Sequence, residues 1–444
     1  MSESEGRQSL LLPPGTRLLH IGPPKTGTST LQSAARSSRK ELYAAGVHYP
    51  GHRKNHRREF CALMGRADPL IGLSSGRSTP RGATRAQATG VPPMAEWTSL
   101  LADIESEASK RILLSHESAA TAPTSLARKF IRQLGPDRVH VAITLRPPSA
   151  VLPSRWIERL KGGASDTFEE WLARVYGEAG KPISDSLRRT LDQGELVERW
   201  AEVAGPENVT VVVLDGTDKN LLTDTFEQLL GVPERTLTGA VTGGKATNRS
   251  MSLPEADVFR QLNATLRETR GVSWPLYLDV VRGAMNHVLE RRTPLDGEPR
   301  VRMPRWAAEL AVREGQQHAD RIARTGVRVV GSLDALSSRP EVAEDLPPDG
   351  GTCPRSLAVE ALSGAVRGAV RAEQTAAGQA EQAEAPRTRV PGPERRTIKQ
   401  QVAGLPEDAR ARSASAAYPT RDLVRALGLS LRRGVRRRVP GSRR

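Results

Sequence analysis

The sequence predicts an α/β protein with a central, mostly parallel sheet and helices on both of its faces. Short, nearly continuous apolar runs rich in β-branched residues recur along the chain, as is typical of strands buried on both faces of a parallel sheet. Helix-like segments separate these runs, and such alternation favours the doubly covered α/β arrangement. The expected strands are 17–22, 110–115, 139–145 and 209–214, with 327–330 at an edge of the sheet.

Composition limits the classes of protein to which the chain can belong. Only 37% of the 444 residues are hydrophobic and 4% aromatic, so part of the chain is expected to lack a packed core. The two cysteines, Cys61 and Cys353, have neither metal-ligand spacing nor the number needed for a disulfide framework. The N-terminus lacks the features of a signal peptide, and no apolar run is long enough to span a membrane. We therefore expect a cytoplasmic protein without a metal site.

The net charge of +16 is concentrated near the C-terminus. Residues 351–444 contain 19 Lys/Arg and 8 Asp/Glu, so this segment carries +11 of the total. Within it, the run RDLVRALGLSLRRGVRRRV (421–439) places leucines at i, i+4 spacing beside arginines. This pattern is typical of a short basic helix that lies on an anionic membrane surface or binds nucleic acid. A solvated, disordered arginine-rich end is the alternative. Because the rest of the chain is nearly neutral, nucleic acid is not the expected partner.

Changes in amino-acid composition along the chain indicate four segments. Residues 1–15 are expected to be a flexible N-terminus, and residues 16–340 an α/β domain. Residues 341–420 are expected to form a low-complexity linker, within which 372–396 is expected to be disordered, followed by a basic amphipathic tail at 421–444. Inside the domain, residues 50–96 are rich in Gly, Arg, Ser, Thr and Pro. A loop of that length is functional or disordered.

The stretch LLHIGPPKTGTSTLQ (18–32) predicts a phosphate-binding loop. A strand that stops at a glycine-containing loop and opens a helix, here over 28–45, directs free backbone N–H groups and a positive dipole end at an anion. An ordinary capped helix is the alternative, but a cap needs only one hydroxyl. In the nucleotide-binding P-loop the lysine follows the last glycine, an order that this loop does not have. The loop instead combines one cation with several hydroxyls around Gly27: Lys25, Thr26, Thr28, Ser29 and Thr30.

The run from Lys25 to Thr30 resembles the 5′-phosphosulfate loop of bacterial sulfotransferases that use 3′-phosphoadenylyl sulfate (PAPS), which reads roughly Lys-[Ser/Thr]-Gly-Thr-[Thr/Ser]. These enzymes hold the 3′-phosphate of PAPS with an arginine at the end of a later strand and a serine eight residues further on. Arg146 follows the expected strand VHVAITL, and Ser154 lies eight residues later. A guanidinium fork and a hydroxyl are suitable donors for phosphate oxygens. The resemblance implies a P-loop-like sulfotransferase fold.

The resemblance extends over roughly 16–335 through two looser segments, 198–233 and 243–263, and it has two departures. Thr30 stands where cytosolic members carry a tryptophan that stacks on adenine. The late basic cofactor loop of those members is also absent, and Arg249 or Lys245 are the candidates to replace it.

The expected base follows a strand, in the run RILLSHESAA (111–120). The resemblance implies that Lys25 stabilises the leaving oxygen and that a histidine or glutamate accepts the proton of the acceptor. Open α/β sheets bind their ligands at the carboxyl ends of strands, where this run offers His116 and Glu117. We prefer Glu117, with the alternative that Glu117 only caps a helix or pairs with an arginine.

Other histidines are expected to have no catalytic role. His20 is predicted to be a core histidine with satisfied hydrogen bonds. His48, His52 and His56 are expected to be exposed, although His52 or His56 could reach an acceptor from the 50–96 loop.

The function implied is transfer of the sulfuryl group from PAPS, by in-line displacement and without a metal, to a hydroxyl or amine of a glycan, lipid or small metabolite. One alternative is a nucleotide kinase of similar fold, whose magnesium site would need Asp215, the one acidic residue directly after a core strand. Another is a nonenzymatic protein that binds anions or membranes. The basic tail would place the protein at the inner face of the plasma membrane.

Overall fold

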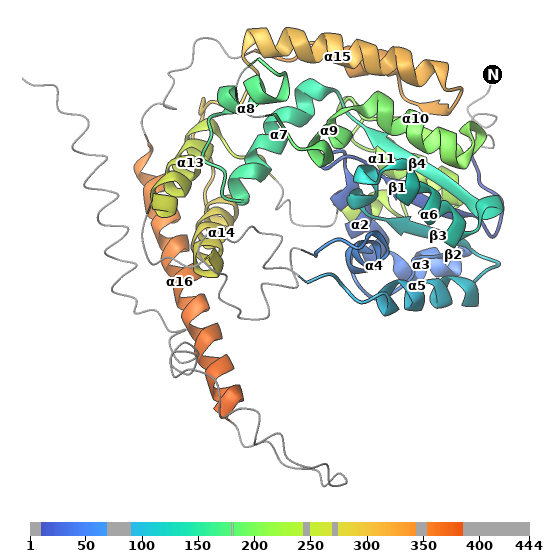
Figure 1. Ribbon diagram of the computed structural model, residues 1–444, viewed down its shortest axis with the longest axis horizontal. Helices are drawn as coiled ribbons and strands as arrows, with labels where there is room; N and C mark the ends of the chain where they lie inside the picture. The colour runs from blue at the N-terminus through green and yellow to red at the C-terminus, as the bar shows by residue number, and fades with distance from the viewer. Residues whose placement is uncertain are drawn as a thin grey trace, which may run out of the picture.

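The computed structural model describes residues 10–68, 90–178, 180, 182–242, 249–268, 274–342 and 353–384. Its centre is a six-stranded sheet with the order β2-β3-β1-β4-β5-β6, in which every neighbouring pair is parallel. This confirms the predicted α/β class and parallel sheet (Figure 1). The strands are β1 (Arg17–Ile21), β2 (Val47–His48), β3 (Arg111–Ser115), β4 (Val139–Leu145), β5 (Val209–Val213) and β6 (Arg328–Val330).

The five strands expected from sequence all form, and β6 lies at an edge of the sheet as predicted. Strand β2 was not predicted, because a strand of two residues is too short to show a repeating pattern of apolar residues. The helix expected over 28–45 is two helices, α2 (Thr28–Ser37) and α3 (Arg39–Ala44), which meet at Ser38.

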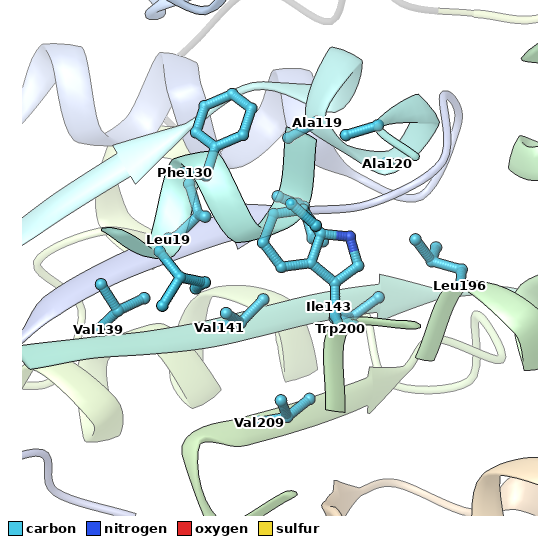
Figure 2. Packing of buried hydrophobic residues seen from close by; sticks show 14 of the residues in the cluster. Leu19, Ala119, Ala120, Phe130, Val139, Val141, Ile143, Leu196, Trp200 and Val209 are labelled. Atoms are coloured by element: carbon cyan, nitrogen blue, oxygen red, sulfur yellow. The ribbon is translucent and has the colours of Figure 1, made fainter. Parts of the chain in front are cut away.

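Helices cover both faces of the sheet, as expected. Successive strand residues point to opposite faces: Leu19 of β1 belongs to one apolar core, and Leu18 to the other. The Leu19 side packs against α4 (Arg57–Met64), α5 (Ala95–Ser106), α6 (Thr124–Leu134) and α10 (Gln193–Ala204). The Leu18 side packs against α2, α3 and α11 (Leu221–Leu230), beside which lies α12 (Thr238–Thr242). Figure 2 shows Phe130 and Trp200 lying over Val141 and Ile143 of β4.

A third apolar core is built mostly from helices. Its helices are α7 (Pro148–Lys161), α8 (Phe168–Val175), α13 (Leu253–Glu268), α14 (Trp274–Arg291), α15 (Arg305–Arg324) and α16 (Arg355–Glu384). Helix α15 joins this core to the sheet, since Ala311 packs among the helices and Ile322 packs on the sheet (Figure 1). The remaining helical segments are α9 (Asp185–Leu191) and the short 3₁₀ turns η2 (Glu117–Thr121), η3 (Pro136–Arg138), η4 (Pro206–Asn208) and η5 (Leu333–Ser337).

Helix α16 corrects part of the prediction of a linker over 341–420, because 355–384 is helical, including the start of the stretch that was expected to be disordered (372–396). The helix packs along α14 (Figure 1), with Leu357, Ala361 and Ala365 buried at i, i+4 spacing. Glycines allow the two backbones to approach closely. A Cβ on Gly283 of α14 would lie 2.6 Å from the carbonyl oxygen of Gly364, so no side chain fits at that crossing. Small residues in a low-complexity sequence therefore form a helix-packing face. The rest of the predicted linker lies largely outside the described residues.

Two other loop predictions are also corrected. The N-terminus was expected to be flexible over 1–15, but Leu12 is buried, and its N–H donates to the carbonyl oxygen of Leu229 at 3.0 Å. The irregular stretch expected over 50–96 contains helix α4 and the start of α5, while its centre lies outside the described residues. Among the described helices, none has the length and apolar character that crossing a membrane requires.

Candidate functional site

The sequence-predicted site residues gather at the carboxyl edge of the sheet. Strand β1 lies between β3 and β4, so the chain turns in opposite directions on either side of it, and open α/β sheets bind ligands at such a switch point. Lys25 follows β1, His116 follows β3, and Arg146 follows β4. The parallel strands bring these three segments, which are far apart in the sequence, to one edge.

The loop between β1 and α2 has a strained backbone. Lys25 has φ +82° and Gly27 has φ +86°, a left-handed conformation that side-chain-bearing residues adopt at a cost of about 1–3 kcal/mol. A Cβ on Gly22 would lie 2.2 Å from Thr144 Oγ1, so the loop can leave the strand only through a glycine. Strain of this kind persists where the surrounding structure holds the backbone in place.

A chain of buried hydrogen bonds links the loop between β1 and α2 to the strands of the sheet. His20 of β1 bonds through Nδ1 to Ser115 Oγ of β3 at 2.8 Å and through Nε2 to Thr144 Oγ1 of β4 at 3.2 Å. Thr144 Oγ1 lies 2.9 Å from Thr26 Oγ1, and the Thr26 hydroxyl also donates to the carbonyl oxygen of Pro23 at 2.7 Å. Three strands are thus linked to the loop, and His20 is the core histidine with satisfied hydrogen bonds that the sequence predicted.

This chain corrects the expected role of Thr26. Its side chain is fully buried, and its hydroxyl is already bonded within the loop and to Thr144. The Thr26 hydroxyl therefore supports the loop from inside instead of facing an anion.

Donors that the helix itself does not satisfy lie at the start of α2. The first hydrogen bond of the helix runs from the Thr30 N–H to the Gly27 carbonyl oxygen at 2.9 Å, so the N–H groups of Gly27, Thr28 and Ser29 have no acceptor within the helix. Thr28 is 4% exposed, and within the described part of the chain its hydroxyl has no hydrogen-bond partner. Ser29 is exposed and Thr30 half-buried. An anion at this helix end would satisfy these groups.

Arg146 and Lys25 lie side by side at this edge. The Arg146 guanidinium donates through Nη1 to the Lys25 carbonyl oxygen at 3.3 Å, and burial lowers the pKa of Arg146. The carbonyl oxygen of Arg146 accepts from Nε2 of Gln193 at 2.8 Å. The structure therefore brings together the lysine and the arginine that the sequence predicted as one site.

Glu158 is a site residue that sequence analysis missed. Its Oε1 lies 2.7 Å from Lys25 Nζ and 2.8 Å from Lys161 Nζ. Burial by itself raises the pKa of Glu158, but Lys161 and Lys25 outweigh this effect, so the pKa lies below its ordinary value. Glu158 follows Ser154 by four residues in α7, so both side chains lie on the face of the helix that meets the loop. That spacing was the available sequence signal.

The two candidate bases differ in what surrounds them. His116 is 3% exposed, and its Nδ1 accepts from the Ser118 N–H at 3.1 Å, which caps η2. Burial lowers the pKa of His116. The Glu117 side chain is 35% exposed, with Oε1 lying 3.5 Å from His116 Nε2. The arrangement leaves Glu117 with the more accessible proton-accepting atom, and His116 with a capping role.

The structure also corrects the expectations for His56 and Arg249. His56 is buried, with Nε2 at 3.1 Å from the Pro50 carbonyl oxygen and Nδ1 accepting from the Ser115 N–H at 3.1 Å. It therefore belongs to the core and has no free ring nitrogen for an acceptor, whereas His52 is exposed as expected. Arg249 pairs with Glu255 through both terminal nitrogens, at 2.7 and 2.8 Å, so it joins α13 to its neighbours. Lys245 lies outside the described residues.

The acidic candidate for a metal, Asp215, binds its own turn. Its Oδ1 accepts from the Thr217 N–H at 2.8 Å and from the Thr217 hydroxyl at 2.7 Å. In the part of the chain that is described, no group of three or more His, Cys, Asp and Glu side chains is arranged to hold a metal ion.

Comparison with known proteins gives no relatives for this chain. It matches no family model, no curated protein and no solved structure.

The buried histidines predict that the protein loses stability in acid. Burial lowers the pKa of His20 to about 3, and of His56 and His140 each to about 4, from about 6.5 in the unfolded chain. Between these values the unfolded state binds protons that the folded state does not. The stability contributed by keeping these histidines neutral is therefore complete above pH 6.5. As the pH drops from 6.5 toward 3, the free energy of unfolding falls by about 1.4 kcal/mol per pH unit for each such histidine.

Urea unfolding at pH 7, 6 and 5 measures this slope in the wild type and in His20→Gln. We expect the slope in the variant to be smaller by about 1.4 kcal/mol per pH unit, whereas His52→Gln, which changes an exposed histidine, should keep the wild-type slope. A wild-type slope in His20→Gln would show that His20 is not held neutral.

Proposed function

We propose that this protein is a PAPS-dependent sulfotransferase with a P-loop-like fold. It transfers the sulfuryl group from PAPS to a hydroxyl or amine of a glycan, lipid or small-metabolite acceptor. The observation that carries the proposal is the meeting of Lys25, the free N–H groups of α2 and Arg146 at the switch point of a parallel sheet. Two separate sequence motifs therefore converge on one place, as binding of a nucleotide with phosphates at both its 3′ and 5′ positions requires.

Each residue has a defined role in this proposal. The N–H groups at the start of α2, with the hydroxyls of Thr28, Ser29 and Thr30, bind the 5′-phosphosulfate. Arg146 and Ser154 bind the 3′-phosphate. Lys25 stabilises the negative charge that develops on the bridging oxygen as the sulfuryl group leaves.

The reaction exchanges one S–O bond for another. The acceptor oxygen attacks sulfur, while the bond between sulfur and the bridging oxygen of the 5′-phosphate breaks and adenosine 3′,5′-bisphosphate leaves. Glu117 accepts the proton of the acceptor hydroxyl. It lies two residues beyond Ser115, which pairs with His20 of the loop-bearing strand, so the base and the phosphate loop belong to adjacent strands.

The contact between Lys25 and Glu158 gives the site a built-in counterion. Glu158 Oε1 forms an ion pair with Lys25 Nζ at 2.7 Å. A phosphosulfate that binds Lys25 must displace this carboxylate. The side chains of Lys25 and Glu158 are 34% and 39% exposed, so solvent weakens their ion pair and the exchange requires little energy.

Calorimetric titration with adenosine 3′,5′-bisphosphate tests the proposal. We expect the wild type to bind it, and Lys25→Ala and Arg146→Ala each to bind it at least tenfold more weakly, because a charge-assisted contact to phosphate is worth about 1.5–3 kcal/mol. ATP with magnesium, titrated in parallel, should bind weakly.

Matched controls for this titration are Lys40→Ala and Arg132→Ala, which remove exposed side chains of the same types elsewhere. Both should bind the bisphosphate as the wild type does. A preference for ATP with magnesium would assign the chain to the kinases instead, and equal affinity in all five proteins would contradict the proposed site.

Replacing Glu158 should strengthen binding of the same ligand. Glu158→Gln removes the carboxylate that competes for Lys25 and keeps the side-chain shape. Because a half-exposed ion pair is worth about 0.2–1 kcal/mol, we expect the affinity for adenosine 3′,5′-bisphosphate to rise about two- to fivefold. Glu202→Gln, at an exposed glutamate paired with Arg128, should leave the affinity unchanged. Weaker binding by Glu158→Gln would mean that the carboxylate supports the ligand instead of competing with it.

The partners proposed are PAPS, an acceptor and, through residues 421–444, an anionic membrane surface at the inner face of the plasma membrane. The basic tail that carries the membrane proposal lies outside the described residues. Its support is the amphipathic pattern of its sequence.

A further inference from the structure

A pocket of about 450 Å³ lies between α15 and the segment that contains α8 and α9. This volume is within the range of small-molecule sites, about 300–1,000 Å³. Neither the phosphate loop nor Arg146 or Ser154 contributes to its lining, so the pocket is separate from the site proposed for PAPS.

A buried histidine of the pocket wall has a donor without an acceptor. His318 is 4% exposed, and its Nδ1 accepts from the Gly194 N–H at 3.3 Å. In the neutral ring the proton is therefore on Nε2. Within the described part of the chain Nε2 has no hydrogen-bond partner, since the nearest carboxylate oxygen, Glu314 Oε1, is 3.6 Å away. Nε2 is itself enclosed by protein atoms, so His318 shapes the wall of the pocket, and the contacts to a ligand come from the more exposed lining residues.

The charges that line the pocket balance. Three guanidinium groups face three carboxylates: Arg188, Arg321 and Arg324, with Asp192, Glu314 and Asp320. Some of these groups are already paired, since Arg321 contacts Asp192 at 2.8 Å and the Tyr176 hydroxyl donates to Glu314 at 3.3 Å. A strongly charged ligand would meet like charges on part of the wall. The lining therefore favours a neutral molecule over an anion or a cation.

The polar groups that line the pocket can form hydrogen bonds with the hydroxyl groups of a ligand. A hydroxyl both donates and accepts, so it can donate to a carboxylate and accept from a guanidinium or from Gln317. An apolar patch of Val175, Ile183 and Leu191 completes the wall and can pack against the C–H groups of a ring. We propose that this pocket binds a neutral, hydroxyl-rich small molecule of the sugar class.

The pocket adjoins the segment that supports Arg146. Asp192 lines the pocket, and the next residue, Gln193, donates through Nε2 to the Arg146 carbonyl oxygen at 2.8 Å. The two sites are therefore neighbours through one backbone segment, but their ligands are held by different side chains. The sugar site does not depend on the proposed sulfotransferase function.

Saturation-transfer NMR with the full chain and maltose tests the proposal, with citrate as the charged counterpart. We expect saturation of the maltose ring protons and none of citrate. Ile183→Trp fills the pocket from a half-buried position and should abolish the maltose signal. Gln317→Ala removes one exposed polar group of the lining and should weaken maltose binding about fivefold, the usual effect of one hydrogen bond.

Two control variants distinguish this site from other binding. Gln261→Ala removes the same type of side chain from the exposed face of α13, and Lys25→Ala alters only the phosphate loop, so both should bind maltose like the wild type. Circular dichroism should show that all variants keep their helical signal. Saturation of citrate instead of maltose, no maltose signal in the wild type, or an equal maltose signal in Ile183→Trp would overturn the proposal.

Discussion

The candidate site depends on the buried hydrogen-bond chain from Ser115 through His20 and Thr144 to Thr26. Each member comes from a different strand or from the loop, so the chain fixes the loop relative to three strands at once. A buried hydroxyl or ring nitrogen that loses its partner costs about 1–3 kcal/mol, which makes any other loop position unfavourable. The chain can therefore hold Lys25 in its left-handed conformation directly before α2.

The rest of the fold places the other site residues around this fixed loop. Helix α7 starts directly after β4 and belongs to the helical core through Leu152, Trp156 and Leu160. Its last turns carry Glu158 to the loop, where the carboxylate meets Lys25. Arg146, at the junction of β4 and α7, contacts the loop on one side and Gln193 on the other. The sheet positions the loop between β1 and α2, and helix α7 positions Glu158 against it.

The sequence predicted the sheet and the turn from β1 into α2 well because both leave local signals. A strand buried on both faces is mostly apolar, as VHVAITL is apart from His140 and Thr144. A loop that closes on Thr144 must contain a glycine at position 22. His20 was identified as a core residue because it lies inside such a strand.

Contacts between distant segments could not be predicted from the sequence. The Thr26 hydroxyl looked like a ligand donor because its partner, Thr144, is far away in the chain. His56 is in the core because its ring meets Ser115, and Glu158 is at the site because Lys25 reaches α7. Helix α16 was missed for a similar reason, since its small residues have a role only where they pack against α14. Pairing of this kind is set by the packed fold and has no local pattern.

Hydrogen exchange in the presence of adenosine 3′,5′-bisphosphate tests most directly whether the loop, the start of α2 and the β4–α7 junction form one nucleotide site. Peptides that cover residues 22–31 and 145–155 should exchange more slowly with the ligand than without it, because its phosphates accept from the N–H groups of α2 and order the side chains of Arg146 and Ser154. Slower exchange in only one of these two segments, or only in segments away from both, would contradict the account.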